Sequence, residues 1–237
     1  VQDKMGAKHA GAMDISAGCS GYIYAVACAS NMVKAGMYDN VLVIGAEILS
    51  RLVDWQDRST CILFGDGAGA AVIGQVDEGY GLLASELGSD GSLGKILNIP
   101  ASGVAEPVTH RAIDSKRIYI HMEGSEVFKA AVRHMGQTTL STLEKAGITK
   151  EDINMFIAHQ ANDRIIQSLA KKLSIPSDRM YVNVDRYGNT SAASVGIALD
   201  EAVRAGLVKH GDYVVLTGFG AGLTSVSYTH LRAHETE

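Results

Sequence analysis

Short apolar runs alternate with longer stretches of helical periodicity along this chain, and this pattern predicts a mixed α/β protein. Runs of apolar and β-branched residues predict strands at 12–16, 40–46, 155–158 and 213–217. Patterns with a repeat near 3.6 predict helices over 19–35, 125–146, 163–174 and 192–205. The stretch from residue 90 to 117 is rich in Gly, Ser and Pro without periodicity, so we expect loops and short strands there.

One helix-strand unit occurs twice. Residues 33–45 and 203–218 share a Val-basic-Ala-Gly helix end followed by an apolar strand. Gly36 and Gly206, like Gly147, stand where a helix favours a left-handed residue after its last turn. Cys19 precedes Gly36 by 17 positions, and Asn189 precedes Gly206 by 17. If the repeat is structural, Cys19 and Asn189 stand at equivalent helix starts and could face one another.

Composition narrows the function classes. The chain has 237 residues, of which 46% are hydrophobic and 20% charged, enough for a sizeable core. Its net charge of −5 disfavours nucleic acid or a membrane surface as a partner bound by overall charge. Three cysteines without CxxC spacing predict neither a disulfide framework nor a zinc site, and a reducing, cytoplasmic setting is expected.

No signal peptide or membrane-spanning run is apparent, because no apolar stretch reaches about 20 residues. The chain begins with Val1 and leads at once into the strand predicted at 12–16. We therefore expect that its amino terminus is cut.

Cys19 is a candidate nucleophile. It lies in Ser-Ala-Gly-Cys-Ser-Gly, where a predicted strand turns through small residues into an apolar helix. A thiol at a helix N-terminus meets unpaired N–H groups and the positive end of the helix dipole, which favour a thiolate. The alternative is a small buried core residue, and that interpretation is given to Cys28 and Cys61.

His159 and Asn189 are further candidates. His159 ends the apolar run 153–158, and the ends of strands in α/β sheets are where reacting groups gather. Asn189 lies in a run of small residues before a helix, where an ordinary N-cap is the alternative. Five other histidines are expected to be structural or on the surface, and none has metal-ligand spacing: His9, His110, His121, His134 and His210.

Two glycine-rich segments need separate interpretations. Residues 65–69 superficially resemble a nucleotide loop, but a strand-like run follows them, so close packing of backbones is the better explanation. Residues 218–222 follow a predicted strand and could bring backbone N–H groups near a reacting carbonyl. Arg164, Lys171 and Lys172 share one face of the helix predicted after His159.

Together, Gly-Cys-Ser-Gly at 18–21, His-Gln-Ala-Asn at 159–162 and Gly-Asn-Thr-Ser-Ala-Ala-Ser at 188–194 resemble β-ketoacyl-acyl-carrier-protein (ACP) synthase III of the thiolase superfamily. Asp-Arg at 57–58, the segment 66–71 and Glu-Val-Phe-Lys at 126–129 follow in that family's order. The likeness runs from about residue 8 to 224. Residue 125 is Ser where some relatives carry Asn, and from Ser225 onward we expect the chain to leave the family pattern.

The resemblance implies a decarboxylative condensation of an acyl-CoA with malonyl-ACP, with no permanently bound cofactor and no metal. It implies that Cys19 accepts the acyl group, with the backbone N–H groups of Cys19 and Ala221 as its oxyanion hole. His159 and Asn189 would form a second oxyanion hole for the enolate. Two sets of binding residues are implied as well, namely Arg58 for CoA, and Lys129, Arg164, Lys171 and Lys172 for docking of the acyl carrier protein.

The implied fold is a thiolase-like αβαβα arrangement of two pseudo-equivalent halves, the first incomplete, in a cytoplasmic homodimer. We divide the chain into a first half at 1–90 with the cysteine, a loop-rich connection at 91–120, and a second half at 121–226 with His159 and Asn189. Residues 227–237 are expected to be a non-native tail.

Other functions stay open. Polyketide- or quinolone-forming relatives also use Cys, His and Asn, and the chain could be an inactive acyl-binding fragment. Thiolases would need a second cysteine near the last Gly-rich loop, and elongating synthases a histidine in place of Asn189. Neither requirement is met by this sequence.

Overall fold

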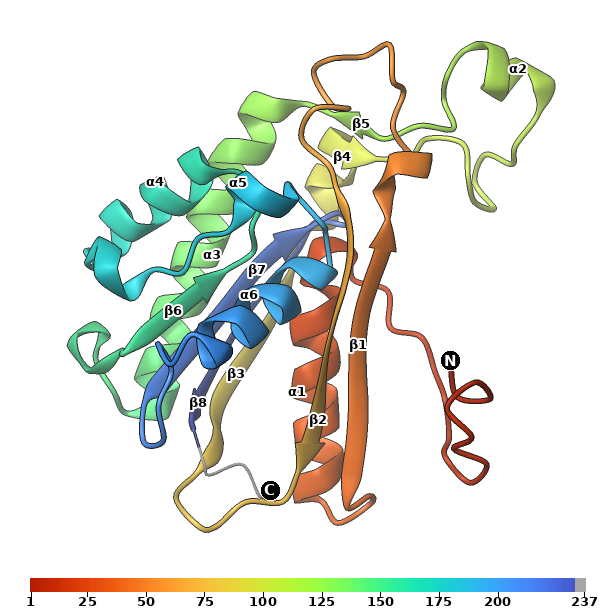
Figure 1. Ribbon diagram of the computed structural model, residues 1–237. Coiled ribbons are helices and arrows are strands. Elements are labelled where there is room, and N and C mark those ends of the chain that lie inside the picture. Colours follow the sequence, from red (N-terminus) through yellow and green to blue (C-terminus); the bar gives the residue numbers. More distant parts are fainter. Residues whose placement is uncertain (233–237) are drawn as a thin grey trace.

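The structure is a computed structural model that describes residues 1–232 (Figure 1). Its helices are α1 (Gly21–Lys34), α2 (His110–Asp114), α3 (Gly124–Ala146), α4 (Asp163–Leu173), α5 (Val184–Tyr187) and α6 (Ala193–Arg204). Its strands are β1 (Asn40–Ile48), β2 (Asp66–Gly74), β3 (Gly81–Ser89), β4 (Leu97–Asn98), β5 (His121–Met122), β6 (Met155–Ala158), β7 (Tyr213–Gly220) and β8 (Thr224–Leu231). Short 3-10 turns include η1 (Gly18–Ser20) and η3 (Gly91–Ile96).

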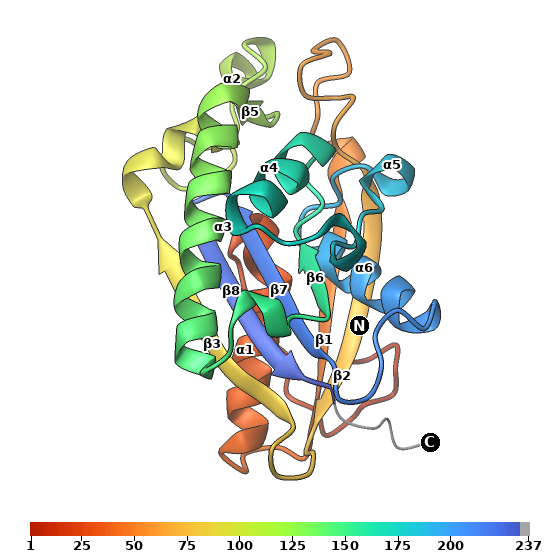
Figure 2. The same cartoon turned by 90° about the vertical axis from the view of Figure 1, so that its left-hand side faces the viewer.

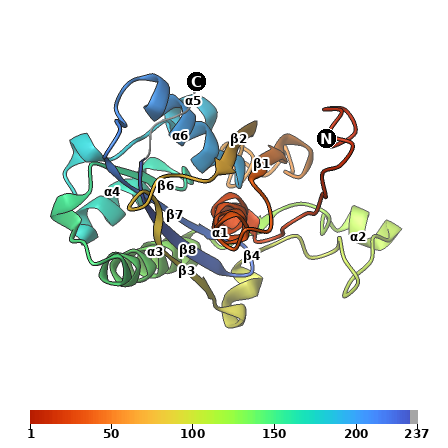
Figure 3. The same cartoon turned by 90° about the horizontal axis from the view of Figure 1, so that it is seen from below.

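The main sheet has the strand order β3-β8-β7-β6, in which β6 and β7 run parallel and the other neighbours antiparallel. Helices α3 and α4 cover one face, and α1 and α6 cover the other (Figures 2 and 3). Side chains along β7 alternate between the two cores, since Val215 and Phe219 pack toward α3 and α4 while Val214 and Leu216 pack toward α1 and α6.

A second, antiparallel sheet of β1 and β2 lies on the far side of α1 and α6 (Figure 3). Its contact with α6 is very close, because a Cβ on Gly69 would lie 2.6 Å from the backbone nitrogen of Ile197. The close-packing interpretation of the glycines at 65–69 is therefore confirmed. The opposite face of this sheet exposes Leu42, Ile44 and Val72.

Most predicted elements form, and the duplicated helix-strand unit is present. Helices α1 and α6 both end at an alanine C-cap with nearly the same dihedral angles, followed by Gly36 at φ 69° and Gly206 at φ 71°. Each is followed by an apolar strand, β1 or β7. Gly147 after α3 is also left-handed, at φ 68°. The mixed α/β class is confirmed.

The strand predicted over residues 12–16 is wrong. These residues pair with no strand of the described chain, and Met13 is 65% exposed. A strand needs a neighbour that takes up its N–H and C=O groups. Apolar sequence alone does not supply one.

The last described residues also differ from expectation. Residues 224–231 form β8, which lies between β3 and β7 in the middle of the main sheet. Ser227 and Thr229 on β8 are fully buried, and their hydroxyl groups have no hydrogen-bond partner in the described structure. Of the tail predicted at 227–237, residues 233–237 lie outside the described residues. The predicted domain boundary at residue 90 follows β3, although β3 pairs with β8 in the second half's sheet.

Candidate active site

Cys19 lies in η1, at the point where the chain enters α1, and is 8% exposed. Glycines from two segments let the backbones touch here. A Cβ on Gly18 would lie 2.7 Å from the Ala221 nitrogen, and one on Gly220 would lie 2.5 Å from the Cys19 nitrogen. Gly18 also has a left-handed φ of 53°. The Gly-rich loop after β7 is therefore pressed against the cysteine turn.

The thiol of Cys19 is not a ready-made thiolate. Burial raises its pKa above the usual 9.0, and the negative charge of Glu47 acts in the same direction. The Ser191 hydroxyl and the backbone N–H groups of Cys19 and Ala221 oppose this rise without cancelling it. Desolvation therefore opposes the thiolate that the helix N-terminus was expected to favour. The two amides nevertheless lie at the sulfur.

Asn189 lies near the start of the segment between α5 and α6 and is 8% exposed. Its backbone N–H donates to Leu63 O at 2.8 Å, and its backbone oxygen accepts from Gly65 N–H at 2.9 Å. Its side-chain Oδ1 accepts from the Ser191 N–H at 2.9 Å. This bond turns the oxygen back to the main chain and leaves the Nδ2 hydrogens to point elsewhere.

His159 follows β6 and is 2% exposed. Its backbone N–H donates to Thr217 O at 2.8 Å, which continues the pairing with β7. The ring Nδ1 shares a hydrogen bond of 2.7 Å with Ser194 Oγ in the first turn of α6. Burial lowers the pKa of His159 from 6.5 to about 4, so the ring is neutral near pH 7.

The segment 189–194 brings the three candidate residues together. It contains Asn189, its Ser191 hydroxyl acts on the Cys19 thiol, and its Ser194 hydroxyl bonds to His159. The two helix starts also touch, since a Cβ on Gly21 would lie 3.5 Å from Ala192 Cβ. Residues from three distant parts of the sequence therefore meet at one short segment.

A polar network holds the chain ahead of Asn189. The Gln160 side chain is buried, donates to Ala158 O and Tyr181 O, and accepts from Asn183 N–H at 2.9 Å. On the outer side the Glu201 carboxylate accepts hydrogen bonds from four residues, namely Tyr181, Asn183, Arg186 and Tyr187, at 2.6 to 3.2 Å. Sequence reasoning missed Gln160 and Glu201 as site-supporting residues.

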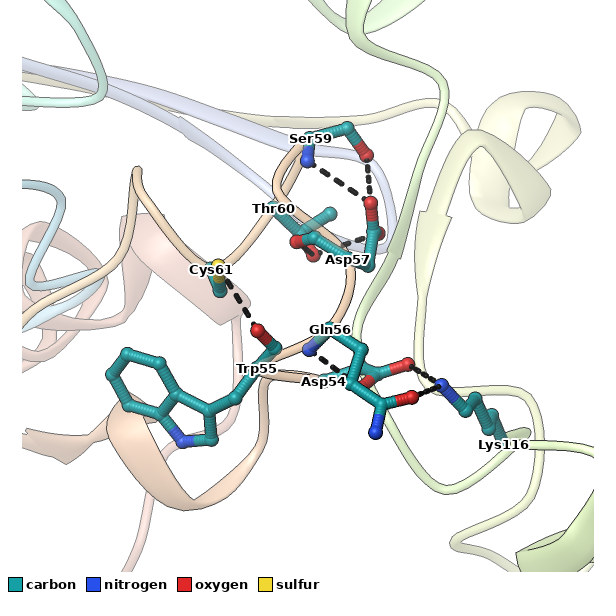
Figure 4. A network of polar contacts seen from close by, with 8 residues as sticks. All are labelled: Asp54, Trp55, Gln56, Asp57, Ser59, Thr60, Cys61 and Lys116. Atoms are coloured by element: carbon teal, nitrogen blue, oxygen red, sulfur yellow. Dashed lines mark hydrogen bonds and ion pairs between the residues drawn. The ribbon is translucent and has the colours of Figure 1, made fainter.

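Arg58 is exposed in the loop between β1 and β2. This loop is internally bonded, because the Asp57 carboxylate accepts from the Ser59 N–H and hydroxyl and from the Thr60 hydroxyl (Figure 4). Lys116 ties it to the α2 segment through Asp54 at 2.7 Å and Gln56 at 2.8 Å.

Cys61 lies in this same loop. Its Sγ lies 3.9 Å from the Trp55 carbonyl oxygen (Figure 4). Cys61 and Cys28 are both half-buried, so the core interpretation is wrong for them. For Cys61 the reason is that its neighbours Ile62 and Leu63 precede β2 without pairing along it.

The four basic residues expected to dock a carrier protein are exposed on the adjoining helices α3 and α4. Lys129 forms an ion pair of 2.8 Å with Glu126. Lys172 lies across α3, where its Nζ donates to Val132 O at 3.4 Å. Within residues 1–232 no three His, Cys, Asp or Glu side chains are grouped to hold a metal ion. The described helices also include none long and apolar enough to cross a membrane.

Known proteins match this chain over most of its length. The family model described as 3-Oxoacyl-[acyl-carrier-protein (ACP)] synthase III matches residues 13–91, and its C-terminal counterpart matches residues 143–230. The expectation that the family pattern ends at Ser225 is therefore wrong as far as residue 230. A β-ketoacyl-[acyl-carrier-protein] synthase III of Caldanaerobacter subterraneus is 56% identical over 227 residues, which cover 96% of this chain and 69% of the relative.

Solved structures show the same relationship. The synthase III of Thermus thermophilus is 47% identical with a TM-score of 0.91, over 99% of this chain and 72% of that one. A priming β-ketosynthase from the R1128 polyketide pathway is 35% identical with a TM-score of 0.88, over 99% and 69%. The chain belongs to the β-ketoacyl-ACP synthase III family, acyltransferases of the thiolase-like condensing class.

Proposed function

We propose that this protein condenses an acyl-CoA starter with malonyl-ACP to give β-ketoacyl-ACP, the reaction that initiates fatty acid synthesis, and that Cys19, His159 and Asn189 carry it. The observation that supports these residues is the segment 189–194, which includes Asn189. In this segment the Ser191 hydroxyl bonds to the Cys19 thiol, and the Ser194 hydroxyl bonds to the His159 ring.

In the first step the sulfur of Cys19 attacks the thioester carbonyl of acyl-CoA. The new carbon–sulfur bond replaces the bond to CoA, and the thiol proton leaves with the CoA thiol. The backbone N–H groups of Cys19 and Ala221 lie at the sulfur and can donate to the oxyanion formed there. Because burial raises the pKa of the thiol, these donors matter most once charge develops.

In the second step the bond between the malonyl carboxylate and its α-carbon breaks and CO₂ leaves. The electron pair stays on the substrate as an enolate, whose oxygen accepts hydrogen bonds from His159 and Asn189. The enolate carbon attacks the acyl-Cys19 thioester, and the Cys19 thiolate departs. The His159 ring is neutral near pH 7, and a neutral imidazole still has one N–H that can donate a hydrogen bond to the enolate oxygen.

Substrate binding follows from the exposed cations. Arg58 would contact the CoA nucleotide, and Lys129, Arg164, Lys171 and Lys172 would bind the acidic carrier protein. A chain of net charge −5 attracts another acidic protein only through such a local patch. The five-layered form of the fold, the division at residues 90 and 120 and the homodimer stay predictions from the family resemblance. So does the non-native tail, but only beyond residue 230, where the family match ends.

The division of labour is tested by measuring two steps separately. Intact-protein mass reports acylation of Cys19 by acyl-CoA, and CO₂ release reports decarboxylation of malonyl-ACP. We expect Cys19→Ser to lose acylation, while His159→Ala and Asn189→Ala retain it and slow CO₂ release by about 100-fold. Cys28→Ser is the matched control and should retain both steps. Equal loss of acylation in all three site variants would contradict these roles.

The same assays address docking. Reversing Arg164 and Lys171 to Glu should raise the KM for malonyl-ACP and its salt dependence, and should spare acylation by acyl-CoA. Unchanged, salt-insensitive kinetics with malonyl-ACP would make this surface an ordinary solvated face.

A further inference from the structure

The hydroxyl of Ser194 lies between the ring of His159 and the backbone of Gln160. Its Oγ is 2.7 Å from His159 Nδ1 and 3.3 Å from the Gln160 nitrogen, which donates to it. All three residues are at most 2% exposed. The roles proposed above give Ser194 no part in the reaction.

Counting hydrogens distinguishes the two neutral forms of His159. A serine hydroxyl has one hydrogen and two acceptor lone pairs, and the Gln160 N–H takes one of those lone pairs. If Nδ1 carries no hydrogen, the Ser194 hydroxyl donates to it, and Nδ1, the Ser194 hydroxyl and the Gln160 N–H are all paired. If Nδ1 carries the hydrogen, it donates to Ser194, and the Ser194 hydrogen then needs another acceptor. None is recorded for it among residues 1–232.

The buried setting makes that difference costly. A hydroxyl hydrogen that is removed from water and left without an acceptor costs free energy comparable to a lost hydrogen bond. Rearrangement is also restricted. Ser194 is held in the first turn of α6, with its N–H donating to Ser191 O at 3.2 Å. The Gln160 side chain is fixed by bonds to Ala158, Tyr181 and Asn183, so its backbone N–H stays directed at Ser194.

We propose that Ser194 is a positioning residue that holds His159 as the tautomer with its hydrogen on Nε2. The inference rests on the proposed function in one respect, namely that the Nε2 hydrogen is donated to the enolate oxygen of malonyl-ACP. In this tautomer Nε2 has no lone pair for a proton, so His159 does not act as a base toward the Cys19 thiol. In the opposite tautomer Nε2 would carry a lone pair in place of the hydrogen. His159 could then accept the Cys19 proton at Nε2 and could not donate from Nε2 to the enolate.

The tautomer is measurable without catalysis. In protein labelled with ¹⁵N-histidine, ring-nitrogen spectra near pH 7 distinguish protonated from unprotonated positions, and His159→Gln identifies the signals of His159 among the eight histidines. We expect the hydrogen on Nε2 in the unmodified protein and in Ser194→Thr, and a mixture of both tautomers in Ser194→Ala. A hydrogen on Nδ1 in the unmodified protein would overturn the inference.

Kinetics gives an independent test. Ser194→Ala should slow CO₂ release from malonyl-ACP about 10-fold, the size typical when a residue that orients a functional histidine is removed, and Ser194→Thr should restore it. Cys19 acylation should stay close to normal in both variants, which also shows that they fold. Loss of acylation with normal CO₂ release would mean that His159 serves as a base, and would overturn the inference.

The His159→Ala variant separates the two levels of the argument. If His159→Ala slows CO₂ release and Ser194→Ala does not, the role of Ser194 is wrong and the proposed function stands. If His159→Ala leaves CO₂ release unchanged, the proposed role of His159 is wrong, and the nitrogen spectra still decide whether Ser194 sets the tautomer.

Discussion

The turn that carries Cys19 and the turn that carries Asn189 occupy equivalent positions in the duplicated unit, but they are held by different means. Each opens a helix that ends at a left-handed glycine 17 residues later. The Cys19 turn is fixed by bare backbone against backbone. The Asn189 turn also has backbone hydrogen bonds, to Leu63 and Gly65, but polar side chains hold it in addition.

At the Cys19 turn the determining feature is the absence of side chains at two glycines. Because Gly18 and Gly220 have no side chains, the end of β7 can contact the Cys19 turn. Gly18 lies against the Ala221 nitrogen, and Gly220 lies against the Cys19 nitrogen. This approach places two backbone N–H groups at the sulfur. Backbone donors fixed in this way need no reorganisation when charge develops on a substrate.

At the Asn189 turn, hydrogen bonds from polar side chains add to the backbone contacts. Both Gln160 and Glu201 bond to Asn183 in the preceding segment. The buried Gln160 side chain accepts from the Asn183 backbone N–H, and the Glu201 carboxylate on the outer side accepts from the Asn183 side chain. Burial favours the protonated form of Glu201, but the hydrogen bonds from Asn183 and Tyr187 and the charge of Arg186 outweigh it and lower the pKa of the carboxyl. The Cys19 turn should therefore be intolerant of added atoms, and the Asn189 turn should in addition be sensitive to the loss of its side-chain partners.

The largest effect is expected from adding one methyl group to the Cys19 turn. In Gly220→Ala the new Cβ would lie 2.5 Å from the Cys19 nitrogen and 2.9 Å from the Ser20 nitrogen, where only backbone movement can relieve the clash. We expect at least about 3 kcal/mol less free energy of unfolding, measured in urea, together with loss of Cys19 acylation.

Gly91→Ala is the matched control, because a Cβ there would meet no atom within 4 Å. It should change stability by less than about 0.5 kcal/mol and leave acylation unaltered. A Gly220→Ala protein that is acylated at the normal rate would show that the close approach is not what places the amides.

Local signals in the sequence account for much of this fold. The predicted helices and the strands β1, β6 and β7 form because periodicity and glycine ends are properties of short segments. Cys19 and Asn189 could be singled out for a similar reason, since small residues before a helix mark a turn that brings backbone close to a ligand. The repeat then linked two turns that are far apart in sequence.

The rest depends on tertiary contacts that no short segment encodes. Residues 12–16 have strand composition but pair with no described strand, whereas residues 224–231 are polar and still lie in the centre of the main sheet. Ser194 and Glu201 look like ordinary helix residues. Only their neighbours in space, His159 for one and a set of four donors for the other, show what they do.

The pH dependence of stability should separate the two sides of the site. The pKa of His159 is about 4 in the folded protein and 6.5 in the unfolded chain, so the unfolded chain binds a proton more readily between these values. Stability is therefore full above pH 6.5 and is lost as the pH falls toward 4, by up to about 3 kcal/mol. The raised pKa of Cys19 acts at the other end, where stability falls as the pH rises above 9.0.

Urea unfolding of His159→Gln and Cys19→Ser across this range checks the assignment. His159→Gln should flatten the acid limb relative to the unmodified protein, and Cys19→Ser should flatten the alkaline limb. If the acid limb of His159→Gln keeps its full slope, the loss belongs to other groups, such as His230, whose pKa is also lowered to about 4 by burial.

The smallest effect is expected from removing the outer grip on the Asn189 turn. Glu201→Ala deprives Tyr181, Asn183, Arg186 and Tyr187 of their shared acceptor. The carboxylate is 20% exposed and Arg186 is 50% exposed, so water replaces part of what is lost and screens the ion pair. We expect a cost of about 2 kcal/mol in unfolding free energy, slower CO₂ release from malonyl-ACP, and unchanged Cys19 acylation.

Asp200→Ala provides the control from the next position on α6, because Asp200 forms an exposed ion pair with Arg204 at i, i+4. Such a pair contributes about 0.3 to 0.5 kcal/mol, and its loss should affect neither step of the reaction. Equal costs for the two variants would mean that Glu201 is another surface charge. A loss of acylation in Glu201→Ala would mean that the two turns are mechanically coupled, since disturbing the polar network would then have reached the glycine-lined turn around Cys19.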